Sequence, residues 1–349
     1  VFSYPKQIDG EDSLPSPLLL AHSLKLLEHL PGWAEDEWQL AVLKAEKPGV
    51  DPLTMPGPLQ RRTARGGTSI LRHQALCPFR AFASNRLGAE GLETPVDGIS
   101  AMLHGSLMHR VLEEFWRETV SRENLLALNA PALVKRLESH IDRVLDDERG
   151  LRYRPEFRNV EAGRLLRLAL KFLELDRQRE PFRVEGFERE ILHEIEGQTI
   201  RLIVDRVDRL EGGGEAIIDY KTGRVDPKKW FGERPEDPQL PLYAISAMHP
   251  PDAVVFAVVR DDECLYRGVV NRKGLFPDLP PPPRAGNEAL IGAGNNLPAT
   301  IAEWKSVLHG LMADFLAGEA SIDPKDGLKT CDNSYCELRS LCRVDEMLQ

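Results

Sequence analysis

The chain has 349 residues, 42% of them hydrophobic and 29% charged, and carries a formal net charge of −10 at pH 7. This is the composition of a globular protein with a sizeable core, and no apolar run approaches the roughly 20 residues that a membrane-spanning helix needs. The acidic balance excludes a uniformly basic nucleic-acid binder. Local basic tracks are still compatible with it, because phosphate contacts depend on the cations that face the backbone.

Residues 1–60 are predicted to be peripheral. Helical periodicity covers 17–30 and 34–46, and four prolines punctuate 48–58, which predicts a linker or a draped loop. The chain does not begin with methionine, and no signal peptide is visible. We therefore expect the tail of a preceding domain, in a fragment of a longer cytoplasmic protein, followed by a main domain over 61–349.

Helices are predicted for the first half of the main domain. The stretch 68–87 predicts one helix that ends at Cys77 and a second that starts at Pro78, because proline is tolerated in a first helical turn. A strong helix follows over 100–119, and 131–180 predicts two or three more.

Strands are predicted for the second half. Apolar and β-branched runs place them at about 182–195, 200–210, 216–221, 252–260 and 264–271. A helix at 238–247 separates the third strand from the fourth, and such a crossover implies that these two strands are parallel. We therefore predict an α/β fold with a mixed central sheet and flanking helices. A Pro/Gly/Asn-rich loop over 279–298 and a final helix over 299–316 complete it.

Two acidic residues and a lysine lie on neighbouring predicted strands joined by a glycine-rich turn. Alternate residues of a strand share a face, so Ile203, Asp205 and Val207 are expected to point one way, and Asp219 and Lys221 to point together. Two carboxylates beside an ammonium predict a site for a hard divalent cation, Mg²⁺ or Mn²⁺. The alternative is a surface hairpin with an ordinary Asp–Lys pair. It is disfavoured because both aspartates interrupt apolar strands, where an unpaired carboxylate costs free energy.

The spacing of these residues resembles the PD-(D/E)XK nuclease core in its RecB-type form, in which an Asp is followed fourteen residues later by D-Y-K-T-G, as Asp205 is by Asp219 here. The resemblance implies that the helical block at 120–180 is an insertion between the first core helix and the sheet. It also implies that Asp205 and Asp219 hold the metal, that the main-chain carbonyl of Tyr220 is a further ligand, and that Lys221 activates the attacking water.

Two further ligands follow from the same resemblance. His109 ends a G-x-x-x-H motif that begins at Gly105, and the family's His is a metal ligand; a structural histidine facing the core is the simpler alternative. Glu188 lies seventeen residues before Asp205 (205 − 188), the spacing of the family's first-strand glutamate. Glu185 and Glu190 compete with Glu188 for this role, and an acidic strand edge without a role is the alternative.

Two pairs of neighbouring polar residues complete the predicted site. Gln239 and Tyr243 form the family's Q-x-x-x-Y motif and share a helix face, which implies that they orient Lys221 or contact DNA; an ordinary amphipathic helix is the alternative. Arg206 and Asp208 are predicted to form an ion pair rather than a second metal site.

Four cysteines predict a metal-binding staple. Cys331, Cys336 and Cys342 form C-x4-C-x5-C near the end of the chain, and Cys77 stands 254 residues before the first of them. Four thiolates can hold zinc or an iron–sulfur cluster, and spacing alone does not separate the two. The arrangement resembles RecB-like nucleases of the AddB kind, which implies a [4Fe–4S] cluster, with zinc as the less favoured occupant.

The resemblance implies a Mg²⁺-dependent deoxyribonuclease, acting as an exonuclease on a single-stranded DNA end, monomeric as a fragment, and joined to a helicase module or subunit in double-strand-break repair. Two alternatives remain: an inactive DNA-end-binding scaffold and a stand-alone exonuclease of the CRISPR-adaptation kind. Clusters of basic residues are candidates for DNA backbone contacts, with a solvated surface as the simpler reading. They are Arg61, Arg62, Arg65, Arg72, Arg80, Arg86, Arg224, Lys228 and Lys229.

Overall fold

The computed structural model describes residues 66–91, 98–152, 154–272, 274–277, 279 and 297–347, together with the backbone of 7–8 and 11–12. The chain divides into two compact units, Val1–Gly49 and Val50–Gln349. In the first unit the structure describes a two-residue ladder of β1 (Gln7–Ile8) and β2 (Glu11–Asp12). The segments predicted at 17–30, 34–46 and 48–58, and most of the loop at 279–298, lie outside the described residues.

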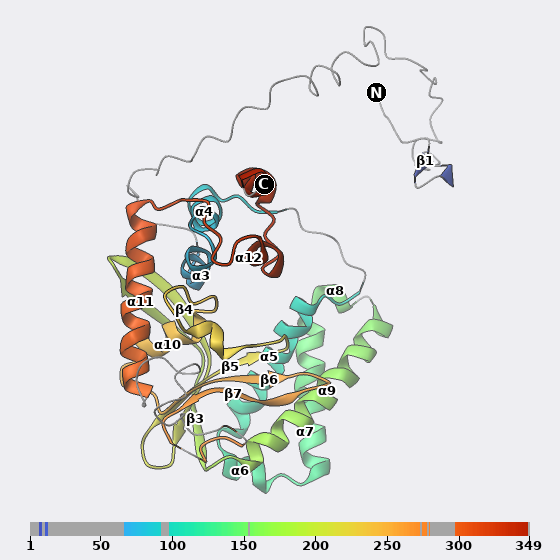
Figure 1. The fold of residues 1–349 in the computed structure, drawn as a ribbon. Helices are drawn as coiled ribbons and strands as arrows, with labels where there is room; N and C mark the ends of the chain where they lie inside the picture. Colours follow the sequence, from blue (N-terminus) through green and yellow to red (C-terminus); the bar gives the residue numbers. More distant parts are fainter. Residues whose placement is uncertain are drawn as a thin grey trace. The chain divides into compact units, whose positions relative to one another are not determined.

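The second unit is organised around one five-stranded sheet (Figure 1). Its strands are β3 (Phe182–Ile195), β4 (Gln198–Leu210), β5 (Glu215–Lys221), β6 (Ala253–Val259) and β7 (Cys264–Val270), and they lie side by side in that order. All neighbours are antiparallel except β5 and β6, which are parallel. The 3-10 turn η2 (Pro227–Trp230) and α10 (Gln239–Ser246) make the crossover between those two strands. The predicted mixed α/β sheet is therefore confirmed.

Helices cover both faces of the sheet, which explains why every residue of β6 is buried. Val255 and Ala257 pack toward the larger helical layer, and Val254 and Phe256 pack toward the smaller one. The larger layer holds α5 (Ala101–Thr119), α6 (Arg122–Ala127), α7 (Ala130–Asp147), α8 (Arg149–Arg152) and α9 (Pro155–Gln178). The smaller layer holds α3 (Thr68–Leu76), α10 and α11 (Leu297–Ala317).

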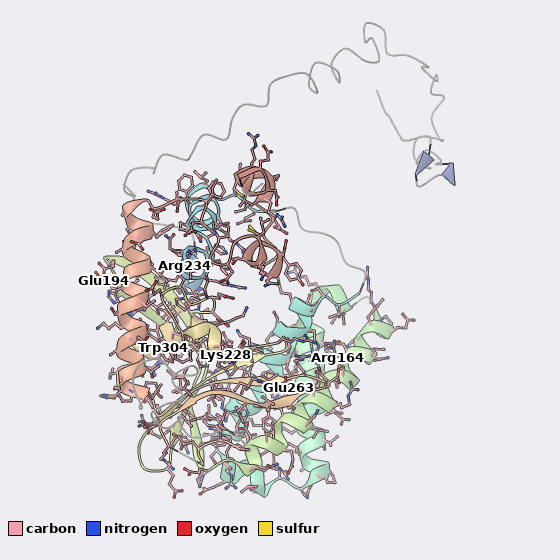
Figure 2. The ribbon with its side chains drawn as sticks, viewed as in Figure 1. Arg164, Glu194, Lys228, Arg234, Glu263 and Trp304 are labelled. Atoms are coloured by element: carbon pink, nitrogen blue, oxygen red, sulfur yellow. The ribbon has the colours of Figure 1, made fainter. Side chains whose placement is uncertain are left out.

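Aromatic contacts anchor α11 to the sheet. Trp304, labelled in Figure 2, lies 6.0 Å from Trp230 between ring centroids, and Trp230 in turn lies 5.0 Å from Phe256 of β6. Such ring pairs add to the stabilisation from area burial.

In the described part of the chain, no helix has both the length and the apolar character needed to cross a bilayer.

The two ends of the second unit pack together in a small separate core. α4 (Pro78–Ala81) and the π-turn η1 (Phe82–Leu87) contact α12 (Leu328–Asn333), α13 (Arg339–Cys342) and α14 (Val344–Met347). Cys77 is extended (φ −168°, ψ 122°) and separates α3 from α4, as predicted from Pro78. Backbone hydrogen bonds from Phe79 N to Ser321 O (2.9 Å) and from Lys325 N to Leu76 O (3.0 Å) join the two segments.

One expectation about β4 is wrong. Val204 and Val207 pack into the same core cluster, whereas Arg206 lies on the opposite face over Trp116 of α5, 4.2 Å from the ring centroid. The alternation of faces therefore breaks between 204 and 207, and Ile203, Asp205 and Val207 do not all point one way. The break coincides with irregular pairing, because Glu188 opposite Asp205 has a φ of +42° and the register has a shift between Val184 and Gly186.

Candidate active site

A lysine, an aspartate and a glutamine form a hydrogen-bonded triangle where β5 ends. Lys221 Nζ lies 2.7 Å from Asp219 Oδ2 and donates to Gln239 Oε1 at 3.0 Å. Gln239 Nε2 donates to Asp219 Oδ1 at 2.8 Å. Asp219 is completely buried, and the Lys221 side chain is 29% exposed. The ammonium is thus held in a fixed position with one side open.

The helix α10 holds this triangle against the sheet. Gln239 is the first residue of α10, and its Nε2 also lies 2.8 Å from Tyr243 Oη, one turn further along. The Tyr243 hydroxyl donates to the main-chain oxygen of Ile203 on β4. The Q-x-x-x-Y pair therefore ties α10 to both strands that carry the aspartates, which gives it a positioning role toward Lys221.

Three ligand atoms converge beside the triangle. One atom each from His109, Glu188 and Asp205 lie within 4.8 Å of one another. His109 Nδ1 on α5 is 3.2 Å from Asp205 Oδ2, which also accepts the main-chain N–H of Tyr220 at 2.8 Å. These contacts fix Asp205 between the helix and β5.

Glu188 differs from the two glutamates that compete with it. Glu185 pairs with Arg209 at 2.9 Å, and Glu190 pairs with Arg201 at 3.0 Å, both on the surface. Glu188 instead faces Asp205, and its φ of +42° is unusual for a residue with a side chain. Backbone in this region costs free energy and persists where the surroundings impose it, a pattern common at functional sites.

The predicted ligand trio of His109, Asp205 and Asp219 is brought together in part. Among the described residues, the three-ligand group has Glu188 in place of Asp219. The Asp219 carboxylate instead contacts Lys221 and Gln239, and the charge of Asp205 raises its pKa. The ligand roles of Asp219 and of the Tyr220 carbonyl stay predictions.

The site carries more negative charge than its own cations offset. Burial and then the charge of Asp205 raise the pKa of Asp219 to about 7, even though Lys221 acts in the opposite direction. Burial lowers the pKa of His109, but Asp205 and Asp219 outweigh this and raise it above its ordinary value. Burial also raises the pKa of Glu188, helped by Asp205. Carboxylates gathered this way gain from a bound cation, so the donor set fits a hard divalent metal.

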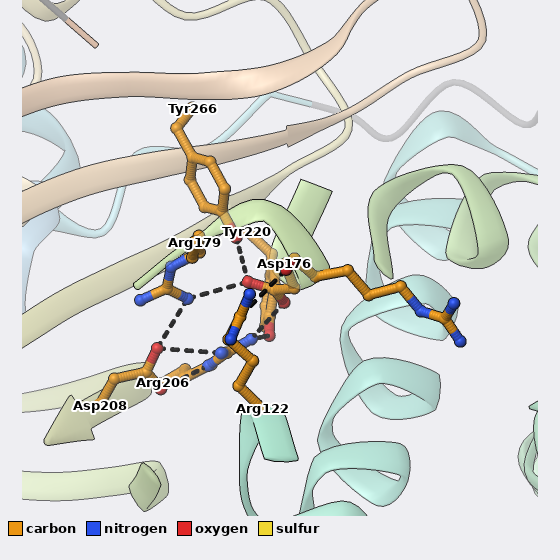
Figure 3. Close-up of polar contacts among 8 residues, drawn as sticks. Arg122, Asp176, Arg179, Arg206, Asp208, Tyr220 and Tyr266 are labelled. Carbon is orange, nitrogen blue, oxygen red and sulfur yellow. Dashed lines mark hydrogen bonds and ion pairs between the residues drawn. The ribbon is translucent and has the colours of Figure 1, made fainter. Parts of the chain in front are cut away.

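A buried charge ring lies behind the site, made of Asp176, Arg179, Arg206 and Asp208 (Figure 3). Each arginine touches both aspartates at 2.6 to 2.9 Å, and all four side chains are 0% exposed. The predicted Arg206–Asp208 ion pair is confirmed, with two parallel hydrogen bonds. Because positive and negative charges alternate and are equal in number, each charge has a partner in a medium that would otherwise penalise it.

Tyr220 links this ring to the site. Its hydroxyl accepts a hydrogen bond from Arg206 Nη1 at 3.1 Å, and its main-chain N–H donates to Asp205 at 2.8 Å. Asp176 lies on α9, so the ring also fastens the helical insertion to β4 and β5. One pattern in the sequence indicates this ring: Asp176 and Arg179 lie three residues apart and continue the apolar face of α9.

The four cysteines gather in the small core shared by α4, α12 and α13. Cys331 and Cys342 are buried, and Cys77 and Cys336 pack beside them. Burial, followed by the charges of the other three thiolates, raises the pKa of Cys331 to about 11. Packing thus brings together four thiols that span 265 residues of chain (342 − 77).

Two comparisons with known proteins bear on this geometry. A comparison with curated proteins returns no match. The sequence matches the family model of the PD-(D/E)XK nuclease superfamily over residues 68–343, which begins at α3, includes the whole sheet and the triangle, and ends after the last cysteine. The mixed sheet, with its aspartates and lysine on adjacent strands, agrees with that match. The chain therefore belongs to the PD-(D/E)XK nuclease superfamily.

Proposed function

We propose that this protein is a metal-dependent DNA nuclease that hydrolyses phosphodiester bonds. Members of the superfamily are usually nucleases. The observation that carries the proposal is the position of the Asp219–Lys221–Gln239 triangle beside the group formed by His109, Glu188 and Asp205. An ammonium next to a cluster of metal ligands can stabilise the charge that develops when a phosphodiester is hydrolysed.

The proposed metal is Mg²⁺, with Mn²⁺ as the alternative, held by His109, Asp205 and Glu188, with Asp219 next to them. When bound, the metal acts as a Lewis acid on the scissile phosphate. The residues themselves bind and orient: Asp205 is fixed by the N–H of Tyr220, and His109 approaches from α5. Metal binding requires His109 without its proton, so it competes with the raised pKa of that residue.

Lys221 acts as a cation in this proposal rather than as a base. Burial lowers its pKa, but the contact with Asp219 outweighs burial and raises the pKa above the ordinary lysine value. The ammonium therefore stays protonated at neutral pH. It holds the attacking water by hydrogen bonding and stabilises negative charge that develops on the phosphate.

The test is a metal-dependent cleavage assay on end-labelled single- and double-stranded DNA with anaerobically purified protein. We expect cleavage by the wild type and a loss of about 10²–10⁴-fold for Lys221→Ala. Lys135→Ala, at an exposed position on α7, is the matched control and should cleave normally. Full activity of Lys221→Ala would exclude this site, and DNA binding by the wild type without cleavage would favour the scaffold alternative.

We further propose that Cys77, Cys331, Cys336 and Cys342 hold a [4Fe–4S] cluster. Four thiolates can hold either zinc or the cluster, and the resemblance to AddB-like nucleases supports the [4Fe–4S] cluster over zinc. Iron and sulfide analysis of anaerobically purified protein distinguishes the two, because zinc protein is colourless and free of sulfide.

The proposal also covers the biological setting, that is, the partner of the protein and its role in DNA repair. Resemblance to AddB-like nucleases supports an exonuclease that acts on a single strand delivered by a helicase module during double-strand-break repair. This step rests on analogy between folds. Co-purification of a helicase with the full-length protein, and loss of processive digestion when the two are separated, is the expected result.

A further inference from the structure

A polar cleft of about 550 Å³ opens next to Lys221. Three parts of the chain surround it: α3, the segment that follows β5, and α12 of the cysteine-bearing end. Arg234, labelled in Figure 2, joins all three. Its guanidinium donates to the main-chain oxygens of Ala75 (2.8 Å) and Leu76 (3.3 Å) at the end of α3, and to Asp323 (2.7 Å) before α12. The cleft is therefore held in shape by contacts outside its lining.

Two arginines on the cleft wall have no charged or hydrogen-bonding partner for their guanidinium groups among the described residues. Arg72 and Arg224 are exposed, and within the described residues neither has an ion pair or hydrogen bond through its guanidinium. Lys229, a third cation of the wall, is paired with Glu236 at 2.9 Å. Arg72 and Arg224 are thus the cations of the wall, besides Lys221, that are available to an anionic ligand.

Carboxylates also line the cleft and limit what it can bind. Asp226, Glu236, Asp237 and Asp326 offset the four cations of the wall, so the cleft as a whole is close to neutral. A neutral cleft does not attract polyanions at a distance. Binding must come from local contacts, in which arginine hydrogen-bonds to phosphate oxygens and neutral polar groups contact the rest of the ligand.

The part of the cleft wall formed by α12 offers such polar groups. Asn333 and Ser334 at the end of α12 line the cleft together with Thr330. Ser334 is held by Arg80, whose Nη1 donates to the Ser334 hydroxyl at 2.7 Å. Arg80 lies three residues after Cys77, so the position of this wall depends on the segment that carries the first cysteine.

We propose that this cleft is a binding subsite for single-stranded DNA and takes one or two nucleotides next to the scissile phosphate. Arg72 and Arg224 bind the phosphate, and the Asn333–Ser334 edge contacts the base. The volume lies within the range of about 300–1,000 Å³ typical of small-molecule sites. A cleft of about 550 Å³ has room for nucleotides of one strand and not for two paired strands. This inference rests on the proposed nuclease function and names the residues that would select an unpaired strand.

The test compares binding of oligothymidylate and of a blunt duplex to the full chain, with Ca²⁺ in place of Mg²⁺ and with cleavage monitored. The double variant Arg72→Ala/Arg224→Ala is expected to bind the single strand about tenfold more weakly per arginine. The slope of log K against log salt should fall by about 0.7, since each neutralised phosphate on a single strand contributes about 0.7 and the two arginines share one phosphate. Arg183→Ala, at an exposed position on β3, is the matched control and should change neither quantity.

The outcomes separate this inference from the proposed function. Weakened single-strand binding with an unchanged urea midpoint supports the subsite, because neither arginine is needed for folding. Unchanged binding by the double variant, or equal wild-type affinity for duplex and single strand, overturns the subsite even if Lys221→Ala abolishes cleavage. A wild type that neither binds nor cuts DNA overturns the proposed function as well.

Discussion

Replacing Asp219 with asparagine is expected to stabilise the metal-free fold, although the change removes an ion pair with Lys221. In the folded protein, burial and the charge of Asp205 raise the pKa of Asp219 to about 7, from an ordinary value of 3.8. The folded state therefore binds this proton more tightly than the unfolded chain. As a result, the contribution of Asp219 to the free energy of unfolding falls as the pH rises from about 4 to about 7.

The size of the effect follows from the same values. At about 1.36 kcal/mol per pKa unit, ionised Asp219 costs the fold roughly 4 kcal/mol near pH 8. Asparagine keeps the shape of the side chain and has no charge, so Asp219→Asn should recover up to this amount. Near pH 5 the wild-type carboxyl is protonated in the folded state, and most of the difference between the two proteins should disappear.

The assay is urea unfolding in EDTA near pH 8 and near pH 5, repeated with Mg²⁺. A ligand present at 100 times its Kd stabilises the folded state by about 2.7 kcal/mol. Mg²⁺ should therefore raise the wild-type midpoint more than that of Asp219→Asn, which lacks one of the carboxylates at the site. We expect the urea midpoint of Asp219→Asn to exceed that of the wild type in EDTA, and we expect this difference to be smaller in Mg²⁺.

Asp208→Asn is the matched control, because Asp208 is an equally buried strand aspartate with a different environment. Its carboxylate contacts Arg206 and Arg179 in the buried charge ring. Removing it leaves two buried guanidinium groups short of an anion, which costs about 3–5 kcal/mol. The two substitutions should thus act in opposite directions near pH 8. If both destabilise the protein in EDTA, the electrostatic account of the site is refuted.

Three further predictions concern the ligand group, the buried charge ring and the cysteines. Glu188→Gln should raise the Mg²⁺ concentration needed for half-maximal cleavage by at least about tenfold, as for other metal-site residues. The control is Glu190→Gln, which breaks only a surface pair with Arg201 and should leave this Mg²⁺ concentration unchanged. Arg206→Met should lower the free energy of unfolding by about 3–5 kcal/mol in urea, because two buried carboxylates lose a partner. Cys331→Ser should remove the visible absorbance of anaerobically purified protein and lower its thermal midpoint, while substitution of a surface serine should do neither.

The fold was predictable because its signals are local. Strand β3 has the bounds 182–195 that its β-branched composition predicts, and α5 begins after Ser100, whose hydroxyl accepts the N–H of Leu103. The short helix α6 (Arg122–Ala127) escaped prediction, since six residues are too few to show a period. Its cap was nevertheless present in the sequence as Ser121, which accepts the N–H of Asn124 at 3.3 Å.

The site was predictable in its members and less so in their arrangement. Regular alternation along β4 places Ile203, Asp205 and Val207 on one side, but the alternation breaks between 204 and 207, where Glu188 of the neighbouring strand has a φ of +42°. No rule based on a period of two anticipates such a break. Only one of the two aspartate partners of Arg206 could be predicted from the sequence. Asp208 is two residues away, whereas Asp176 lies 30 residues earlier on a helix, and its contact depends on tertiary packing.

The buried charge ring and the site differ in their balance of charge, and Tyr220 connects them. The ring is electrically balanced and joins α9 to β4, so it adds rigidity without net charge. The site is unbalanced, because Asp205 raises the pKa of Asp219 and no nearby cation fully offsets the two carboxylates. On a flexible sheet, repulsion between the Asp205 and Asp219 carboxylates would move them apart. Tyr220 prevents this by accepting from Arg206 through its hydroxyl while its main-chain N–H holds Asp205. The balanced ring thus helps to hold Asp205 in position through Tyr220, and the proposed cation would offset the charge of the two carboxylates.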